Sequence, residues 1–461
     1  MTLTLDSALP DELLLQITDN LSFPELLVSS HVCQRLRQVA QASDVFWQIV
    51  SAHSVSSAHL AMLKRRIAAG LGRPFELHLH FPQILAPEEQ TEISVVLNTS
   101  TVARLTSFTL HGDGETMECL MQHLRAAPAP LLEDLELSMA TYDGNFPTAE
   151  LPPDIFASQA QNLQSAALRR VAILDSHLPA FDQLCTLKYE LVRGAVPLGM
   201  LTHARKLRTL ELSGWLLWLP SNMTPESHSF TATLTHLHVS VLSHQYGPLG
   251  WLPQLDRIPA ISFMPEPSAD FARALVHHLS GPIRISIRDE RRSVCSIKFE
   301  EMHTGRWRRI GYAKVARSDA SRRQFGNTIR DTYFADATLQ LPDRTLALSL
   351  TVKTAWAAEF LPQLPCCAEL ALLVERTNDT AKPNAEVNSS LDVPILHTIN
   401  ISSRRAKESL NAEVLVSILS QLLSLPLVDA VRPQLWIRQI SLCGNTMKLG
   451  ANFDLHYAGP L

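Results

Sequence analysis

Apolar residues recur at helical spacing over residues 8–50, and this pattern sets the segment apart from the rest of the chain. The sequence Pro10-Asp11-Glu12 suits a helix start, because the first turn leaves backbone N–H groups unpaired and proline has none. Leu13, Leu14 and Ile17 follow at helical spacing. The pattern predicts a short helix with one apolar stripe.

Two further helices and a final turn are predicted in the same segment. Ser22 and Glu25 have the spacing of a capping box, in which each side chain pairs with a free backbone N–H of the other residue. Ser43 and Asp44 are residue types that cap a last turn, here the one that carries Trp47. A bundle of about 45 residues has a marginal core, so it usually packs on the rest of its chain or on a partner.

Beyond Pro74, short apolar runs of the form LxxLxL replace the helical spacing. The candidate strands begin at Phe75, Leu105, Leu132, Leu168, Leu207 and Leu234. From Leu105 onward the intervals are 27, 36, 39 and 27 residues, and the wider ones leave room for a further strand such as 184–189. Helical spacing returns in three stretches, at 117–126, 269–279 and 408–423.

One strand and one helix in each unit of roughly 20–40 residues is typical of a leucine-rich-repeat solenoid. A single unit cannot cover its own apolar face, so it must stack on the next. The complete repeat consensus, with its asparagine ladder, is absent from the sequence. A general α/β domain with leucine-rich strands is therefore the competing interpretation.

Between residues 283 and 352 apolar and polar residues alternate with period two, and no long helix is apparent. This predicts antiparallel strands inserted in the array or covering it. The predicted fold class is thus α/β: a small N-terminal helical module, then an irregular leucine-rich-repeat-like solenoid with an inserted antiparallel β segment. The predicted parts are the helical module 1–52, a helical linker 53–73, a repeat-like array 74–282, the antiparallel segment 283–352 and repeat-like units 353–461.

Three features of the helical module occur together: a Leu9-Pro10 opening, a Val32-Cys33 pair followed by Arg35, and Trp47. In their order and spacing they resemble the F-box family. The resemblance implies that the module docks on a Skp-type adaptor, which links it to a cullin–RING ubiquitin ligase. Leu36 departs from the family, which often has tryptophan there; leucine keeps the position apolar but offers less contact area.

The resemblance assigns nine residues to adaptor contact or to the core of the module, and for each one both roles are open. They are Leu9, Pro10, Leu13, Ile17, Leu26, Leu27, Val32, Cys33 and Leu36. A second resemblance concerns the whole layout. Residues 74–79 and 151–156 are similar to segments of fungal F-box proteins with degenerate leucine-rich repeats.

If the array is a solenoid, the residues between the buried leucines of each strand line its inner surface, where repeat proteins usually bind their ligands. This predicts a target-binding face made of Thr109, His111, Glu136, Ser138, Glu211, Ser213, Trp215, His238 and Ser240.

Composition and charge narrow the functional classes. The 461 residues are 46% hydrophobic and 18% charged, as in a folded protein, and a net charge of -5 argues against a nucleic-acid or membrane role of the whole chain. The stretch from Arg284 to Arg330 differs, with thirteen basic and five acidic residues and a net charge of +8. It could form a surface for an acidic partner, or it could be solvated strand faces that pair with acids elsewhere.

Catalytic motifs are missing: the sequence has no P-loop, no GxSxG elbow and no HExxH. The pairs His78/His80 and His236/His238 lack the further ligands of a metal site, so we expect no metal and no cofactor. Seven scattered cysteines suit reduced thiols, and the N-terminus does not have the pattern of a secretory signal. We therefore expect a cytoplasmic or nuclear protein.

Two functional hypotheses follow from these patterns. The first is a non-catalytic receptor that docks on a Skp-type adaptor and selects an unknown protein for ubiquitination. The second is an F-box-like scaffold that acts outside any ligase and binds an acidic partner through the basic stretch 284–330. An enzymatic function has no group of residues behind it.

Overall fold

The fold is described from a computed structural model of the chain. It describes residues 9–53, 56–70, 72–81, 84–140, 149–191, 196–214, 231–241, 255–264, 268–290, 294–312, 318–374, 391–403, 408–423 and 432–458. The chain divides into two compact units, Met1–Leu234 and Thr235–Leu461, hereafter unit 1 and unit 2. The finer division that the sequence suggests stays a prediction.

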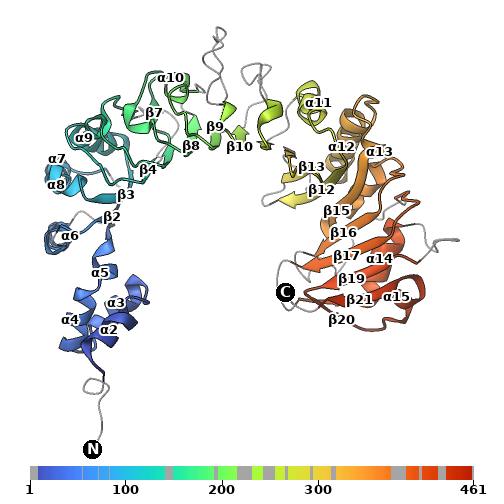
Figure 1. Ribbon diagram of the computed structural model, residues 1–461, viewed down its shortest axis with the longest axis horizontal. Helices are drawn as coiled ribbons and strands as arrows, with labels where there is room; N and C mark the ends of the chain where they lie inside the picture. Colours follow the sequence, from blue (N-terminus) through green and yellow to red (C-terminus); the bar gives the residue numbers. More distant parts are fainter. Residues whose placement is uncertain are drawn as a thin grey trace, which may run out of the picture. The chain divides into compact units, whose positions relative to one another are not determined.

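Unit 1 begins with the helices that the spacing of apolar residues predicts (Figure 1). They are α2 (Asp11–Thr18), α3 (Phe23–Ser30), α4 (Gln34–Ala42) and the single turn α5 (Asp44–Gln48). The next strand, β1 (Ile49–Ala52), follows α5 without a linker. The helix α6 (Ser57–Ala69) occupies the predicted linker and buries Leu60, Leu63 and Ile67.

The sheet of unit 1 is parallel, and each strand pairs with the next one along the chain. Its strands are β1, β2 (Phe75–His80), β3 (Leu105–Gly112), β4 (Asp134–Met139), β6 (Ser165–Arg169), β8 (Thr186–Leu191) and β9 (Thr209–Gly214). The register aligns one buried residue from each of β2 to β9: Leu79, Leu110, Leu137, Leu168, Tyr189 and Leu212. This ladder holds the strands in register, since a slip of one residue would turn it towards solvent.

Short elements connect these strands. They are α7 (Pro87–Val96), α8 (Thr99–Val102), α9 (Gly114–Leu124), η1 (Ile155–Ser158), η2 (Pro179–Phe181) and α10 (Leu198–Leu201), with the small parallel pair β5 (Glu150–Leu151) and β7 (Ala172–Ile173). Their apolar residues cover the leucine side of the sheet; Met117, Leu120 and Leu124 of α9, for example, are fully buried.

The LxxLxL template locates most strands. In β4, β8 and β9 the first leucine of the template lies before the strand, at Leu132, Leu184 and Leu207, and is buried there; the strand starts about two residues later. In β3 the first leucine, Leu105, is itself the first residue of the strand.

The strand predicted to begin at Leu168 is displaced: β6 ends at Arg169, and residues 172–173 form the separate short strand β7. The buried positions of this unit are Leu163, Ala166 and Leu168. Because alanine takes the place of the second leucine, the segment does not match the LxxLxL template.

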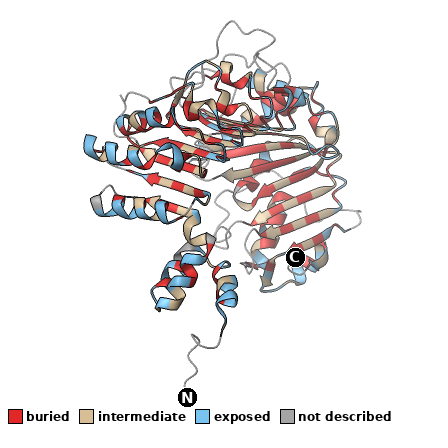
Figure 2. Cartoon of the chain, turned by 60° about the vertical axis from the view of Figure 1, so that its left-hand side comes forward, coloured by how far each residue is buried: buried red, intermediate tan, exposed pale blue. Residues whose placement is uncertain are grey.

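Unit 2 is also built on a mostly parallel sheet (Figure 1). In spatial order its strands are β10 (His236–Val241), β11 (Ala260–Met264), β14 (Trp307–Tyr312), β13 (Val294–Glu301), β12 (Ile283–Glu290), β15 (Thr345–Thr351), β16 (Glu369–Val374), β17 (Thr398–Ser403), β19 (Gln434–Arg438) and β21 (Asp454–Ala458). A separate parallel pair joins β18 (Glu408–Asn411) to β20 (Ile440–Cys443). Figure 2 shows buried and less buried residues alternating along the strands.

The predicted antiparallel segment corresponds to one strand of this sheet. Strand β13 runs antiparallel to β12 and to β14, so the segment is inserted in the sheet and does not cover it. Strand β15 was grouped with it, but it pairs parallel to both β12 and β16. The expectation that this segment holds no long helix was also wrong, because Asp319–Ile329 forms the helix α12.

Helical segments pack against the core of unit 2. They are η4 (Leu255–Arg257), α11 (Ala269–His277), α12, η6 (Arg330–Phe334), α13 (Leu341–Arg344), η7 (Val352–Phe360), α14 (Ala412–Leu422) and α15 (Met447–Asn452). Tyr333 and Trp356 pack among the buried residues of β12 to β17. Within the described residues, no helix has the length and apolar character needed to cross a membrane.

Arg66 joins the N-terminal helices to the sheet of unit 1. Its guanidinium lies 2.8 Å from the carbonyl oxygen of Phe46 and 3.0 Å from that of Ile49, and it stands over the Phe46 ring. Burial lowers the pKa of this arginine. Because Arg66 lies on α6, the two hydrogen bonds hold α5 and the start of β1 against that helix.

Replacing Arg66 with alanine is expected to destabilise this junction by about 1–3 kcal/mol, because two carbonyls lose a charged donor. Thermal unfolding and chymotrypsin cleavage near Phe46 measure the effect. Arg65→Ala is the matched control, since Arg65 is the adjacent exposed residue. Equal effects of the two substitutions would contradict the role given to Arg66.

Candidate functional site

Six of the residues predicted for target binding lie in unit 1. Thr109 and Glu136 are register partners on β3 and β4, and so are His111 and Ser138. Glu211 and Ser213 lie on β9. All six alternate with the buried ladder residues and so share the opposite face of the sheet. Ser138 is only 8% exposed and offers little surface.

The remaining predicted target-binding residues are placed differently. His238 and Ser240 are partly exposed residues of β10 in unit 2, and they alternate with buried Leu237, Val239 and Val241. Trp215 lies outside the residues that the structure describes. The structure therefore brings six of the nine onto the sheet face of one unit.

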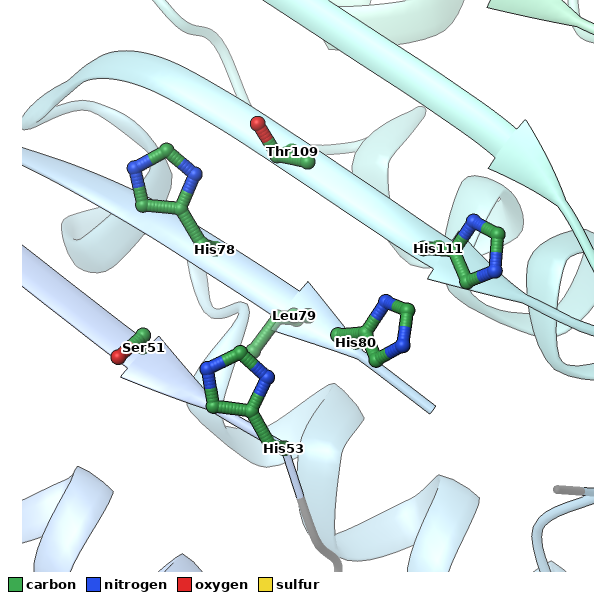
Figure 3. A pocket seen from close by; sticks show the side chains of 7 residues that line it. All are labelled: Ser51, His53, His78, Leu79, His80, Thr109 and His111. Atoms are coloured by element: carbon green, nitrogen blue, oxygen red, sulfur yellow. The ribbon is translucent and has the colours of Figure 1, made fainter. Parts of the chain in front are cut away.

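An open hollow of about 500 Å³ lies where this face meets the first strands. It is lined by Ser51, His53, His78, Leu79, His80, Thr109 and His111. Figure 3 shows four imidazole rings: two from β2, one from β3 and one from His53, the residue that follows β1. Sequence reasoning considered His78 and His80 only as a pair. It missed the grouping because the other two histidines come from different strands.

Two of these rings stack. The centroids of His80 and His111 are 4.5 Å apart with an interplanar angle of 11°, and His53 lies 5.8 Å from His80 on its other side. Burial, followed by the neighbouring His80, lowers the pKa of His111. Among the described residues, no group of three potential ligand side chains is placed to hold a metal ion.

The basic stretch 284–330 is distributed over several surfaces of unit 2. Arg284 and Lys298 lie on the open face of the sheet, where they pair with Glu369 at 3.4 Å and Glu300 at 3.0 Å. Arg308 is on the opposite side, fully buried, and donates to three backbone carbonyls. Part of the basic stretch therefore stabilises the fold through internal hydrogen bonds and ion pairs. Four of its residues lie outside the described part of the chain: Arg291, Arg292, Lys314 and Arg317.

The N-terminal helices expose an unusual amount of apolar surface. The exposed fractions are 45% for Leu13, 50% for Ile17, 43% for Leu27 and 69% for both Val28 and Val32. Large apolar side chains left in solvent on a small module mark a surface for protein contact. Val28 is not among the nine residues that the family resemblance assigns to the module, although it is as exposed as Val32.

The other residues carried over from the family pattern divide between surface and core. Pro10 is exposed; Leu9, Cys33 and Leu36 are partly buried. Leu26 is fully buried and therefore packs the module. Across the helices, Arg35 binds the Asp11 carboxylate at 2.7 Å and the Leu9 carbonyl oxygen at 2.6 Å.

The segment that holds these four short helices is similar to a known family. Residues 6–52 match the F-box-like family. A comparison with curated proteins finds no match. The F-box-like module includes β1, so its last four residues already belong to the sheet of unit 1.

The helix starts of the F-box-like module follow the predicted capping in one case and differ in another. The Glu25 carboxylate accepts hydrogen bonds from the backbone N–H of Ser22 at 2.8 Å and from its hydroxyl at 2.6 Å, and these bonds lower the pKa of Glu25. At α5 the Ser43 hydroxyl binds the Asp19 carboxylate at 2.7 Å and does not cap the turn.

Ser22→Ala is expected to destabilise the start of α3 by about 1 kcal/mol. The thermal midpoint of the full-length protein reports the loss. Ser22→Thr keeps the hydroxyl and should restore most of the stability. If threonine and alanine lower the midpoint equally, the capping explanation is incorrect.

Proposed function

We propose that this chain is the substrate-recognition subunit of a ubiquitin ligase of the Skp–cullin–F-box type. The observation that carries the proposal is the F-box-like module with its exposed Leu13, Ile17, Leu27, Val28 and Val32. F-box proteins are typically non-catalytic adaptors. The exposed side chains would contact a Skp-type adaptor, and burying them there would release the water that they now order.

The rest of the chain would select the target protein. We propose that its strand–helix units form a leucine-rich-repeat-like solenoid and that the polar face of the unit 1 sheet binds the target. Thr109, His111 and Glu136 are partly exposed residues of this face. Such a receptor would act in the cytoplasm or the nucleus, where we propose that the protein resides.

Co-purification tests the proposal. The full-length protein, mixed with a purified Skp-type adaptor and a cullin–RING core, should elute as one complex in size-exclusion chromatography. Failure to bind the adaptor under conditions where a known F-box protein binds would overturn the ligase role.

A scaffold outside any ligase is the second candidate function. It is favoured by the sheet face of unit 2, where Lys298 and Arg309 are direct cross-strand partners and Arg284 lies on β12, the strand on the other side of Lys298. Lys298 already pairs with Glu300 and Arg284 with Glu369, and an acidic partner would add further charge complementarity to this face. An acidic partner that binds the full-length protein in the absence of an adaptor would favour this function.

A further inference from the structure

The histidine hollow has hydrogen-bonding capacity that the protein does not use. Within the described residues, the ring nitrogens of His53, His80 and His111 make no hydrogen bond. The carboxylates beside them already have partners. Glu76 lies 3.5 Å from His78, and Glu136 lies 3.6 Å from Arg169. The unmet donors and acceptors of the hollow therefore include these three imidazole groups.

The geometry of these rings is unfavourable for coordinating a metal ion. An imidazole binds a metal in the plane of its ring, along the nitrogen lone pair. The rings of His80 and His111 are stacked almost in parallel, so their lone pairs run alongside each other and do not converge on one point. A ligand that accepts hydrogen bonds at several places suits this arrangement better.

We propose that the hollow binds an acidic segment of the target protein, with His53, His80 and His111 donating N–H groups to its carboxylates. The Thr109 and Ser51 hydroxyls add two more donors at the rim of the hollow. A carboxylate accepts hydrogen bonds only, and bonds to it are stronger than those to neutral acceptors. This inference rests on the proposed role of the unit 1 sheet face in target binding.

Binding of a carboxylate here is linked to proton uptake. In the free protein the charged form of His111 is disfavoured by burial, by His80 and by Arg169, whereas Glu136 acts in the opposite direction. Glu76 is held by His78 beside it. A bound carboxylate favours the imidazolium, so it raises the pKa and the complex takes up a proton. Affinity must then rise as the pH falls, by about tenfold per pH unit for each proton taken up.

The test measures binding of a blocked polyglutamate peptide to the full-length protein by calorimetry at about pH 7.5 and about pH 6, the range in which histidine titrates. A polylysine peptide of equal length is the charge control. We expect the acidic peptide to bind on the order of tenfold more tightly at the lower pH. His80→Gln with His111→Gln should remove most of the pH dependence, since glutamine donates an N–H but cannot be charged and His53 alone of the three proposed donors remains.

The matched control is His203→Gln. His203 belongs to a second stacked pair in unit 1, with its ring centroid 4.1 Å from that of His177, outside the hollow. This variant should keep the full pH dependence. An unchanged pH dependence in the variant with His80→Gln and His111→Gln, equal binding of both peptides, or binding of Zn²⁺ without any peptide binding would each overturn the inference. Adaptor binding, measured on the same variants, should be unchanged, and its failure would count against the proposed function alone.

Discussion

Replacement of Leu13 and Ile17 by aspartate together is expected to abolish adaptor binding by the full-length protein. The two side chains are 45% and 50% exposed on α2, so the module does not need them for its own core. In a complex they would be desolvated, and two carboxylates placed there would have no partner. Buried interface anchors typically cost more than about 2 kcal/mol each when lost, which predicts a loss of at least about a hundredfold in affinity.

The design separates docking from folding. Val95→Asp is the matched control, because Val95 is 58% exposed on α7 and lies outside the F-box-like module. It should leave adaptor affinity within about twofold, as surface substitutions away from an interface do. Circular dichroism and the thermal midpoint verify that both proteins are folded. Adaptor binding by the folded double variant at its original strength would contradict the proposed docking surface.

Phe299→Ala is expected to destabilise unit 2 by about 3–5 kcal/mol, as large-to-small changes at fully buried aromatic residues do. Phe299 is 0% exposed on β13, and its ring centroid lies 4.9 Å from that of Tyr333. Removing the ring leaves a cavity between the inserted antiparallel strand and the helical layer. Hydrogen–deuterium exchange of the peptide 294–301 measures the local free energy of opening.

The adjacent residue provides the control for this prediction. Lys298 points to the open face, where it pairs with Glu300 and stands 5.2 Å from the centroid of the Trp307 ring. Lys298→Ala should cost at most about 1 kcal/mol, because exposed ion pairs contribute little. Similar protection losses in the two variants would mean that β13 does not separate a buried face from an open one.

Leucine spacing predicts the strands of unit 1 well because each strand contributes a fixed set of buried positions. Where leucine fills all three positions of the template, as at Leu132, Leu135 and Leu137, the strand lies where it is expected within two residues. Where a smaller residue such as Ala166 takes one position, packing of the neighbouring strands compensates, and the pattern fails. A strand is specified by which of its positions are buried and by the volume that fills them. The presence of leucine is only an approximate indicator of such positions.

Helix α12, in contrast, could not be predicted from the spacing of its apolar residues. Its sequence is rich in polar residues, and of its side chains Phe325 and Ile329 are fully buried. The Phe360 ring closes over the backbone at Gly326, where any Cβ would lie 2.2 Å from it. Such a helix is held by tertiary contacts at three positions, so its own periodicity is too weak to predict it.

The candidate sites show a similar division. Alternation along a strand places Thr109 and Glu136 on one face, because side chains of neighbouring residues point to opposite sides. It cannot bring together His53, His80 and His111, which belong to three different stretches of the chain and meet only when the strands pair in register. For the same reason, Leu13 and Leu14 look equivalent in the sequence, although one is 45% exposed and the other 7%.

Strand β1 has a practical consequence for deletion experiments on the F-box-like module. Because Ile49–Ala52 hydrogen-bonds along β2, removing the whole matched segment 6–52 would strip β2 of its neighbour and bare a row of unpaired backbone groups. An exposed strand edge of this kind promotes aggregation. The loss of function that follows would then be misread as the effect of losing adaptor docking. A truncation that ends at Gln48 would remove the four helices and leave the first edge of the sheet protected.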